Sequence, residues 1–278
     1  MALNLDAAGR SIGPLTKLFG TKDVILYALG VGAGSGELDL VYEKDLKVLP
    51  SFAVPAVFDF LREVAVQSNL NLAGLLHGEQ DVVFHRPLPS EGTLQTTGRI
   101  TDFFDLGADK GALIKAEGLT RDGGGAKRFT NRVTIFARLD GGFGGKAPPK
   151  QPVVIPDREP DWVVEDRPSK DQPLLYRLSG DLFPLHVDPD FARKSGFDRP
   201  IMHGLCTHGF ACRACVSSLV PGQPEQVKRF FCRFSKPLYP GVSIETRIWK
   251  TGPGEAVWRV VNAETGEVVI DQGVFAYA

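Results

Sequence analysis

The sequence predicts an α+β protein made of two related halves, each with an antiparallel sheet, and one long helix in the second half. Three observations support this prediction. Runs of alternating or continuous apolar residues, separated by turn residues, recur in both halves. Short motifs repeat along the chain. One apolar, proline-free segment, 204–220, has the composition of a buried helix.

The expected strands fall into two groups separated by a proline-rich segment. Those of the first half are 80–88, 92–105, 111–121 and 127–138. Those of the second half are 227–234, 242–250, 256–262 and 268–277. Residues 146–173 hold seven prolines, which disfavour a helix or a central strand. We therefore divide the chain into an N-terminal half, 1–145, a linker, 146–173, and a C-terminal half, 174–278.

Three motifs occur in the same order in both halves. The matched pairs are Leu26-Tyr27-Ala-Leu29 with Leu175-Tyr176-Arg-Leu178, Leu76-His77-Gly78 with Met202-His203-Gly204, and Phe84-His-Arg-Pro87-Leu88 with Phe234-Ser-Lys-Pro237-Leu238. His77 precedes Phe84 by 7 residues, whereas His203 precedes Phe234 by 31. The difference, 31 minus 7, is 24 residues, enough for a helix of about five or six turns and its connection. We therefore expect the long helix only in the second half.

Composition narrows the class of protein. The chain has 278 residues, of which 43% are hydrophobic and 23% charged, as in ordinary globular proteins. A net charge of -1 argues against a nucleic-acid or anionic-membrane partner. The N-terminus lacks the basic flank and apolar stretch of a signal peptide, and no apolar run is long enough to span a membrane. We expect a cytoplasmic protein.

The four cysteines lie close together, at positions 206, 212, 215 and 232. Cys212 and Cys215 have CxxC spacing, and with His203 and His208 nearby they raise the question of a zinc site. Three of the four cysteines, however, fall in the expected apolar helix, where cysteine is commonly a small buried residue. We therefore predict structural cysteines and no metal.

The glycine-rich stretch Gly30-Val-Gly-Ala-Gly-Ser-Gly36 superficially resembles a dinucleotide-binding loop. That fingerprint requires a helix directly after the glycines, within a βαβ unit. Here Glu37-Leu-Asp-Leu-Val-Tyr42 follows instead, so we interpret the stretch as a plain loop.

Reactive side chains are concentrated between residues 176 and 208. Asp181 and His186 are five residues apart with Pro184 between them, which excludes a regular helix and favours a loop that turns both side chains toward one point. A carboxylate and an imidazole that share a water can perform general acid/base chemistry near neutral pH. The alternative is that Asp181 caps a turn and His186 packs in the loop. The repeat places Gly32 opposite Asp181, so this pair occurs once per chain.

The dipeptide His203-Gly204 opens the expected long helix. A helix N-terminus presents unpaired N–H groups and partial positive charge, which stabilise a developing oxyanion. Gly204 would let a ligand approach closely. The alternative is that the glycine merely eases entry into a buried helix.

With these motifs, the chain resembles the type-two, (R)-specific 2-enoyl-CoA hydratases, which are MaoC-like dehydratases. Their signature is Tyr-x-Leu-Ser-Gly-Asp-x-Asn-Pro-Leu-His-x-Asp-Pro, and this chain supplies Tyr176, Leu178, Ser179, Gly180, Asp181, Pro184, Leu185, His186, Asp188 and Pro189. Similar agreement extends over nearly the whole chain, through Leu76-His-Gly-Glu-Gln80, Gly141-Gly-Phe-Gly-Gly145, His203-Gly-Leu-Cys-Thr207 and Phe234-Ser-Lys-Pro-Leu-Tyr-Pro-Gly241.

The resemblance implies a double hot-dog fold, with two antiparallel sheets and a long central helix kept only in the C-terminal half. It implies hydration of trans-2-enoyl-CoA to (3R)-3-hydroxyacyl-CoA, and the reverse dehydration, without a cofactor. Asp181 and His186 match the catalytic pair. The residues that match substrate-binding positions are His203, Gly204, His77, Gly78 and Phe234. The expected partner is an acyl-CoA thioester, and a homodimer is plausible.

One residue departs from the signature: Phe183 stands where the family has an active-site Asn. A phenyl ring makes none of the hydrogen bonds of an amide. Either the site is detuned, or it is reshaped for a different acyl group, and we include Phe183 among the substrate-binding candidates. An expected loss of the first-half helix favours a long or bulky acyl chain. The alternatives are an acyl-CoA-binding accessory subunit with weak or no catalysis, and a hot-dog thioesterase.

Overall fold

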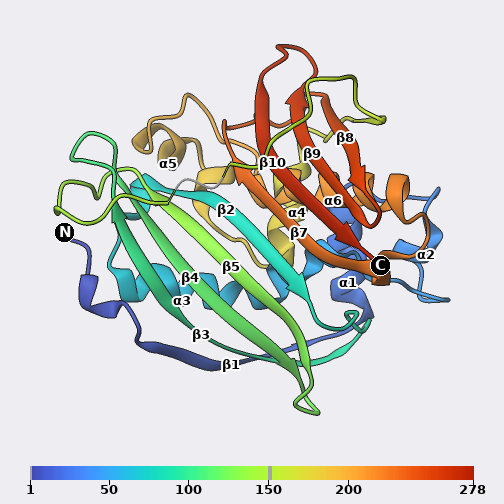
Figure 1. The fold of residues 1–278 in the computed structure, drawn as a ribbon, viewed down its shortest axis with the longest axis horizontal. Coiled ribbons are helices and arrows are strands. Elements are labelled where there is room, and N and C mark those ends of the chain that lie inside the picture. The colour runs from blue at the N-terminus through green and yellow to red at the C-terminus, as the bar shows by residue number, and fades with distance from the viewer. Residues whose placement is uncertain (1, 150–151) are drawn as a thin grey trace.

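The computed structural model describes residues 2–149 and 152–278, whose strands form one antiparallel sheet of ten strands (Figure 1). The strands of the first half are β1 (Ser11–Phe19), β2 (Leu75–Phe84), β3 (Gly92–Asp105), β4 (Ala112–Asp122) and β5 (Lys127–Ala137). Those of the second half are β6 (Trp162–Asp166), β7 (Val227–Phe234), β8 (Ile244–Gly252), β9 (Glu255–Asn262) and β10 (Val268–Tyr277). Their spatial order is β1-β3-β4-β5-β2-β7-β10-β9-β8-β6.

The expectation of two separate sheets is wrong, because β2 and β7 pair at the centre and join them. The register runs from Glu79 opposite Arg233 to Val83 opposite Arg229. Ion pairs across this seam, Arg233 with Glu79 and Arg229 with Asp81, add to the backbone hydrogen bonds. The seam satisfies the backbone groups of two strands that would otherwise be sheet edges.

The sheet order reads as a mirror image about this seam, which agrees with the internal repeat. β1, β3, β4, β5 and β2 correspond to β6, β8, β9, β10 and β7 in turn. Phe84 and Phe234 both end their strands, β2 and β7. The repeated tyrosines Tyr27 and Tyr176 are both buried, and their ring centroids lie 6.1 Å apart.

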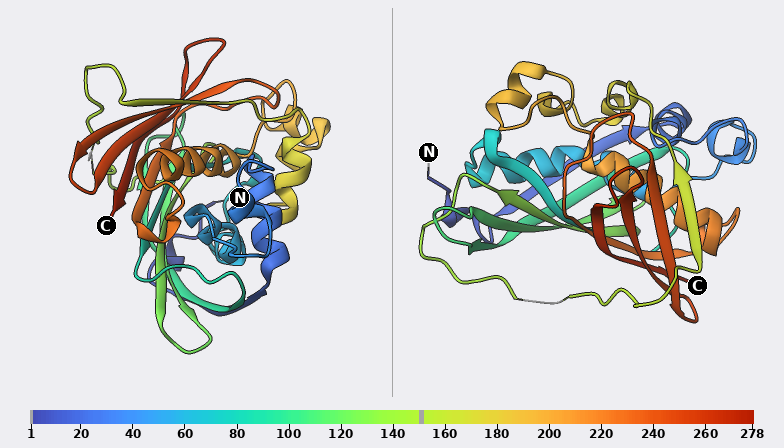
Figure 2. Two further views of the ribbon diagram at one scale, coloured as in Figure 1. Left: turned by 90° about the vertical axis from the view of Figure 1, so that its right-hand side faces the viewer. Right: turned by 90° about the horizontal axis from the view of Figure 1, so that it is seen from above.

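The helices lie on one side of the sheet, which curves around α3 and α6 (Figure 2). The α-helices are α1 (Thr21–Gly30), α2 (Leu38–Val41), α3 (Phe58–Ser68), α4 (Gln172–Tyr176), α5 (Pro189–Lys194) and α6 (Gly204–Leu219). Short 3₁₀ turns are η1 (Leu5–Ala7), η2 (Pro50–Ala53), η3 (Pro55–Val57), η4 (Leu72–Gly74), η5 (Arg177–Ser179), η6 (Pro184–His186) and η7 (Pro224–Gln226). No helix among the described residues is long and apolar enough to cross a membrane.

The first half holds a shorter helix, α3, where we expected that the long helix had been lost, so that expectation needs correction. α3 has 11 residues against 16 in α6, and it precedes β2 as α6 precedes β7. The error comes from matching His77 with His203, because His77 lies within β2 whereas His203 precedes α6. The 24 extra residues between His203 and Phe234 therefore do not correspond to a helix that the first half has lost.

The core of the first half explains two of its glycines. Phe60 of α3 is fully buried against the sheet, over the paired residues Gly98 of β3 and Gly118 of β4. A Cβ at Gly98 would lie 2.5 Å from the Phe60 ring, and one at Gly118 would lie 3.1 Å from it. The two glycines therefore form the hollow that receives this ring.

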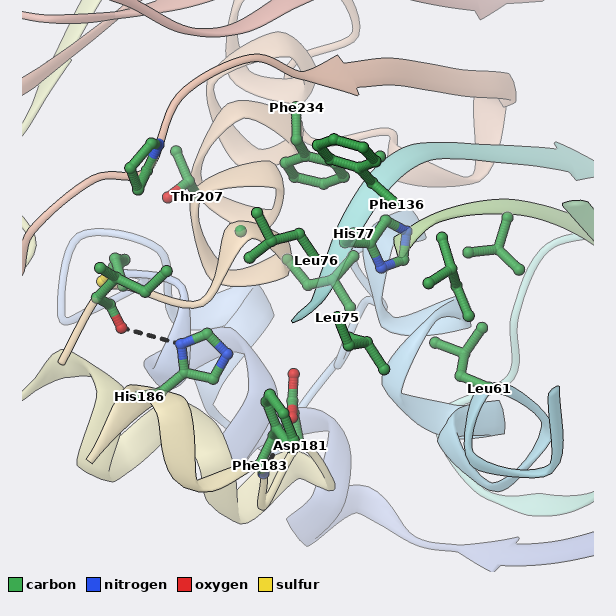
Figure 3. A pocket seen from close by; sticks show the side chains of 18 of the residues that line it. Leu61, Leu75, Leu76, His77, Phe136, Asp181, Phe183, His186, Thr207 and Phe234 are labelled. Atoms are coloured by element: carbon green, nitrogen blue, oxygen red, sulfur yellow. Dashed lines mark hydrogen bonds between the residues drawn. The ribbon is translucent and has the colours of Figure 1, made fainter. Parts of the chain in front are cut away.

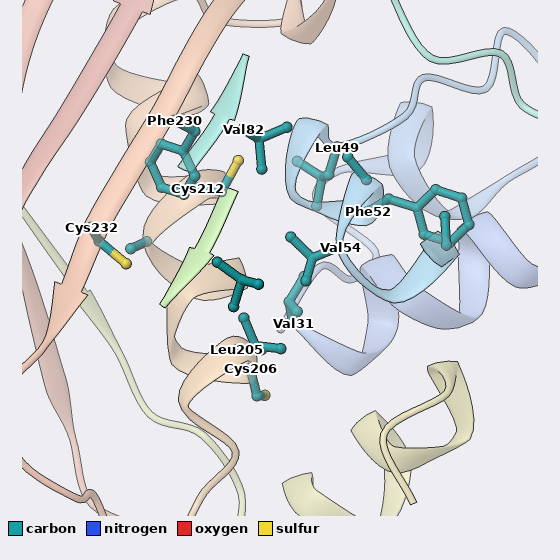
Figure 4. Packing of buried hydrophobic residues seen from close by; sticks show 14 of the residues in the cluster. Val31, Leu49, Phe52, Val54, Val82, Leu205, Cys206, Cys212, Phe230 and Cys232 are labelled. Atoms are coloured by element: carbon teal, nitrogen blue, oxygen red, sulfur yellow. The ribbon is translucent and has the colours of Figure 1, made fainter. Parts of the chain in front are cut away.

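The cysteines are part of the main hydrophobic core. Cys206, Cys212 and Cys215 of α6 and Cys232 of β7 are all buried and unpaired by disulfides. Figure 4 shows three of them among apolar side chains of both halves, between the sheet and the turns around Leu49 and Val54. Burial raises the pKa of each of these thiols, which disfavours the thiolate that binds zinc.

Two predicted connecting segments differ in detail from expectation. The glycine-rich stretch is a loop after α1, as predicted, with Gly32 at φ +85°. A one-turn helix, α2, does follow it, but the preceding segment is helical, so a βαβ unit is not formed there. The proline-rich segment 146–173 contains β6, which pairs with β8 and stands at one end of the described sheet.

Candidate active site

A pocket of about 360 Å³ opens between the two halves of the molecule. The first half contributes α3 and the facing parts of β2 and β5. The second half contributes the loop around Asp181, the start of α6, and residues 234–238 at the end of β7 and just after it. Figure 3 shows Asp181 and His186 on one side of this pocket, with His77, Phe136 and Phe234 on the other. The pocket thus gathers every site residue named from the sequence except His203, which is fully buried.

Asp181 lies in the short loop between η5 and η6 and is 8% exposed. Its Oδ1 accepts a hydrogen bond from the Phe183 N–H at 3.2 Å. Burial raises the pKa of Asp181 to about 6, and this hydrogen bond opposes the rise. The carboxyl group is therefore mostly ionised at pH 7 and available as a base.

His186 occupies the end of η6, and its tautomer follows from its hydrogen bond. Nδ1 lies 2.9 Å from the carbonyl oxygen of Ile201. Because a carbonyl only accepts, Nδ1 carries the proton and Nε2 keeps a free lone pair. Burial lowers the pKa of His186 to about 4, so the ring is neutral at pH 7.

His203, the residue before α6, supports this pair from the core. Its Nε2–H donates to the backbone carbonyl of Asp181 at 3.2 Å. Its ring stacks on that of His186, with 3.8 Å between centroids and 27° between planes. Burial first, and the neighbouring His186 second, lower the pKa of His203 to about 2. His203 therefore contacts both the Asp181 loop and the His186 ring.

The same three residues are the one group of potential metal ligands found among the described residues. One ligand atom from each of Asp181, His186 and His203 lies within 4.8 Å of the others. Imidazole lone pairs lie in the ring plane, however, and two stacked rings direct theirs along nearly parallel planes. Such lone pairs do not converge on one ion at the roughly 2.0 Å that zinc requires. The arrangement fits a shared water better than a metal.

The N-terminus of α6 faces the pocket at Gly204. The first hydrogen bonds of the helix run from the Cys206 and Thr207 N–H groups to the carbonyl of His203. No side chain caps this end, so the N–H groups before Cys206 are free for a ligand. A Cβ at Gly204 would lie 3.0 Å from the Phe234 ring, which explains the glycine.

His77 and Gly78 form the opposite wall, on β2. The His77 ring meets Phe234 edge-on with 5.0 Å between centroids, and burial lowers its pKa to about 4. Gly78 lies where the β2–β5 register shifts, and a Cβ there would come 3.0 Å from the Thr134 carbonyl. Sequence reasoning missed the apolar floor, formed by Leu61 and neighbouring residues of α3, because it did not predict that helix.

Phe183 lines the pocket and belongs to a small apolar cluster. Its ring meets Phe191 edge-on at 5.2 Å and His186 at 6.3 Å between centroids. The ring therefore takes a packing role beside His186.

Comparison with known proteins identifies the family. A MaoC-like domain model matches residues 151–272, and a model of the MFE-2 hydratase 2 N-terminal domain matches residues 18–139. The 3-hydroxyacyl-thioester dehydratase Y of Mycobacterium tuberculosis is 39% identical over 100% of this chain and 99% of its own length. A probable enoyl-CoA hydratase 2 of Dictyostelium discoideum is 37% identical over 95% of this chain and 92% of its own.

Comparison with solved structures points to the same family. A MaoC-like dehydratase from Phytophthora capsici superposes with a TM-score of 0.88 at 33% identity, covering 99% of this chain and 98% of that one. The full-length peroxisomal multifunctional enzyme type 2 of Drosophila melanogaster gives 0.82 at 36% identity, over 95% of this chain and 48% of that one. The chain belongs to the MaoC-like dehydratase family, in the group that includes the hydratase 2 enzymes. It is thus a hydro-lyase.

Proposed function

We propose that the protein adds water to trans-2-enoyl-CoA thioesters to give (3R)-3-hydroxyacyl-CoA, and catalyses the reverse dehydration. The observation that carries this proposal is the pairing of Asp181 with His186 at one side of the pocket. At pH 7 both present hydrogen-bond acceptors, a carboxylate oxygen and the bare Nε2. A water between two acceptors donates both of its protons and directs its lone pairs toward the substrate.

The reaction follows from this arrangement. The water oxygen bonds to C3 of the enoyl group while one of its protons passes to Asp181 or His186. Negative charge then develops on the thioester oxygen, where the free N–H groups at Gly204 and the α6 dipole stabilise it. A proton is returned to C2 on the same face, so that one water is added overall. Removal of the same groups in reverse order gives dehydration.

The acyl chain is proposed to lie along the apolar floor of the pocket. Phe58, Leu61 and Ala65 of α3 line it on one side, and Val133 and Ile135 of β5 on the other. This apolar lining supports a long or bulky acyl chain. We further propose that neither metal nor organic cofactor takes part, that the protein is cytoplasmic, and that a homodimer is its assembly.

Two alternatives lead to different products. A thioesterase would release free CoA, and an accessory subunit would bind acyl-CoA without turnover, a role suggested by Phe183. Incubation with trans-2-enoyl-CoAs of increasing chain length separates them. We expect loss of the enoyl absorbance without release of thiol, fastest on long chains. Thiol release would instead identify a thioesterase, and binding without either signal an accessory subunit.

The pH dependence of hydration tests the role of Asp181. Because burial raises its pKa to about 6, the carboxylate is lost as pH falls through that value. We predict that kcat/KM for hydration falls about tenfold for each pH unit well below 6. A profile that stays flat down to pH 5 would contradict the assignment of Asp181 as a base.

Phe183 offers a second test, on substrate choice. Because its ring packs beside the pocket, we predict that Phe183→Asn lowers kcat/KM about tenfold on long enoyl-CoAs and leaves short ones unchanged or improved. Phe183→Leu is the matched control, since it keeps an apolar side chain. A gain for Phe183→Asn on substrates of every length would show instead that the ring has detuned the site.

A further inference from the structure

The segment from Phe183 to Ile201, here called the His186 segment, carries half of the proposed catalytic pair. It includes η6, α5 and the Ile201 carbonyl that holds the His186 ring. Its buried apolar residues, Leu185, Ala192 and Ile201, form a small cluster separate from the main core. Figure 2 shows α5 at the outer margin, farther from the sheet than α3. Segments with small, separate cores open at lower free energy than the main core does.

Side chains from the first half contact this segment: Leu76 packs against its apolar cluster, and Arg138 hydrogen-bonds to it. Arg138 directly follows β5 and is half-buried. Its Nη2 donates to the carbonyl of Ser195 at 2.8 Å, and its guanidinium lies 5.2 Å from the centroid of the Phe197 ring. The same nitrogen lies 3.4 Å from the Ala73 carbonyl, just before β2. Arg138 thereby links the end of α5 to the sheet of the first half.

We propose that Arg138 is a positioning residue for the hydration reaction. It holds the His186 segment against the first half, so that His186 stays at the distance from Asp181 at which both side chains can bind one water. The two members of the pair are held differently. Asp181 is tied to the core by the hydrogen bond that its backbone carbonyl accepts from the fully buried His203. The His186 ring stacks on His203, while its hydrogen bond goes to the Ile201 carbonyl at the end of its own segment.

The effect that loss of Arg138 should have on the rate follows from the geometry of the shared water, and it rests on the proposed function. A shared water needs both acceptors at hydrogen-bond distance at once. A displacement of about 1 Å in one of them, caused by a change far from the reacting atoms, can cost up to a hundredfold in rate. Neither Ser195 nor Phe197, which the Arg138 guanidinium contacts, lines the pocket, so loss of Arg138 should affect kcat more than KM.

The test compares three variants of the full-length protein. Arg138→Met removes both contacts, and Arg138→Lys keeps a cation and one donor. Arg128→Met is the matched control, because Arg128 lies at the other end of β5, where it bonds Asp122 and the Pro87 carbonyl. We expect Arg138→Met to lower kcat about tenfold with KM changed less than threefold, Arg138→Lys to recover most of that loss, and Arg128→Met to retain the full rate.

Hydrogen exchange of the ligand-free protein gives a readout that does not require the reaction to be known. Amides of residues 187–199 should exchange at least tenfold faster in Arg138→Met, with the rest of the chain unchanged. Unchanged exchange there would overturn the proposal, as would a uniform increase over the whole chain or a rise in KM at constant kcat. Faster local exchange without any effect on turnover would also overturn it, because Arg138 would then stabilise the segment without affecting the reaction.

Discussion

Replacing Asp181 or His186 with Ala should lower kcat for hydration by at least about a hundredfold, the scale of a lost acid/base group. Each side chain supplies one of the two acceptors around the proposed water. Because both act on the same water, the double variant should be little slower than the worse single one. Stopped assays of 3-hydroxyacyl-CoA formation from a long trans-2-enoyl-CoA would measure this.

The control must show that the fold survives. Asp181→Asn keeps the shape of the side chain and removes a buried charge, so its melting temperature should not fall. Asp190→Asn is a matched control on the same segment, since its carboxylate is 76% exposed, and it should retain the wild-type rate. Near wild-type turnover by the Asp181 and His186 variants would refute the pairing.

Phe60→Ala should destabilise the protein by about 3 to 5 kcal/mol, the range for removing a fully buried aromatic ring. The hollow over Gly98 and Gly118 has no side chains of its own to refill the cavity. Val66→Ala on the same helix is the control, because Val66 is 65% exposed and should change stability by less than about 0.5 kcal/mol. Urea unfolding gives both values. A loss below about 1 kcal/mol for Phe60→Ala would mean that α3 does not close the core of the first half.

Local pattern explains why much of the second half was predictable. The strands 227–234 and 268–277 were predicted with the bounds that β7 and β10 have, and α6 ends one residue earlier than expected. Apolar runs bounded by turn residues carry this information along the chain. Short-range sequence information also accounts for part of the candidate site, since Pro184 excludes a regular helix between Asp181 and His186, and both of these residues line one pocket.

What the sequence did not reveal depends on contacts between distant residues. The β2–β7 seam joins segments about 150 residues apart, and nothing local distinguishes a strand that pairs there from an edge strand. α3 was missed because the His-Gly dipeptides were matched as well as the strand ends at Phe84 and Phe234, although only the strand ends occupy equivalent places in the fold. The stacking of His203 on His186 and the reach of Arg138 to Ser195 likewise exist only in the folded chain.

The most direct test of the proposed function is the product formed from trans-2-decenoyl-CoA in D₂O. If one water held by Asp181 and His186 adds to one face of the substrate, the product is (3R)-3-hydroxydecanoyl-CoA with a single deuterium at C2, on the same face as the new hydroxyl. NMR of the isolated product reports both centres. A 3S alcohol, deuterium on the opposite face or free CoA without hydration would contradict the proposal.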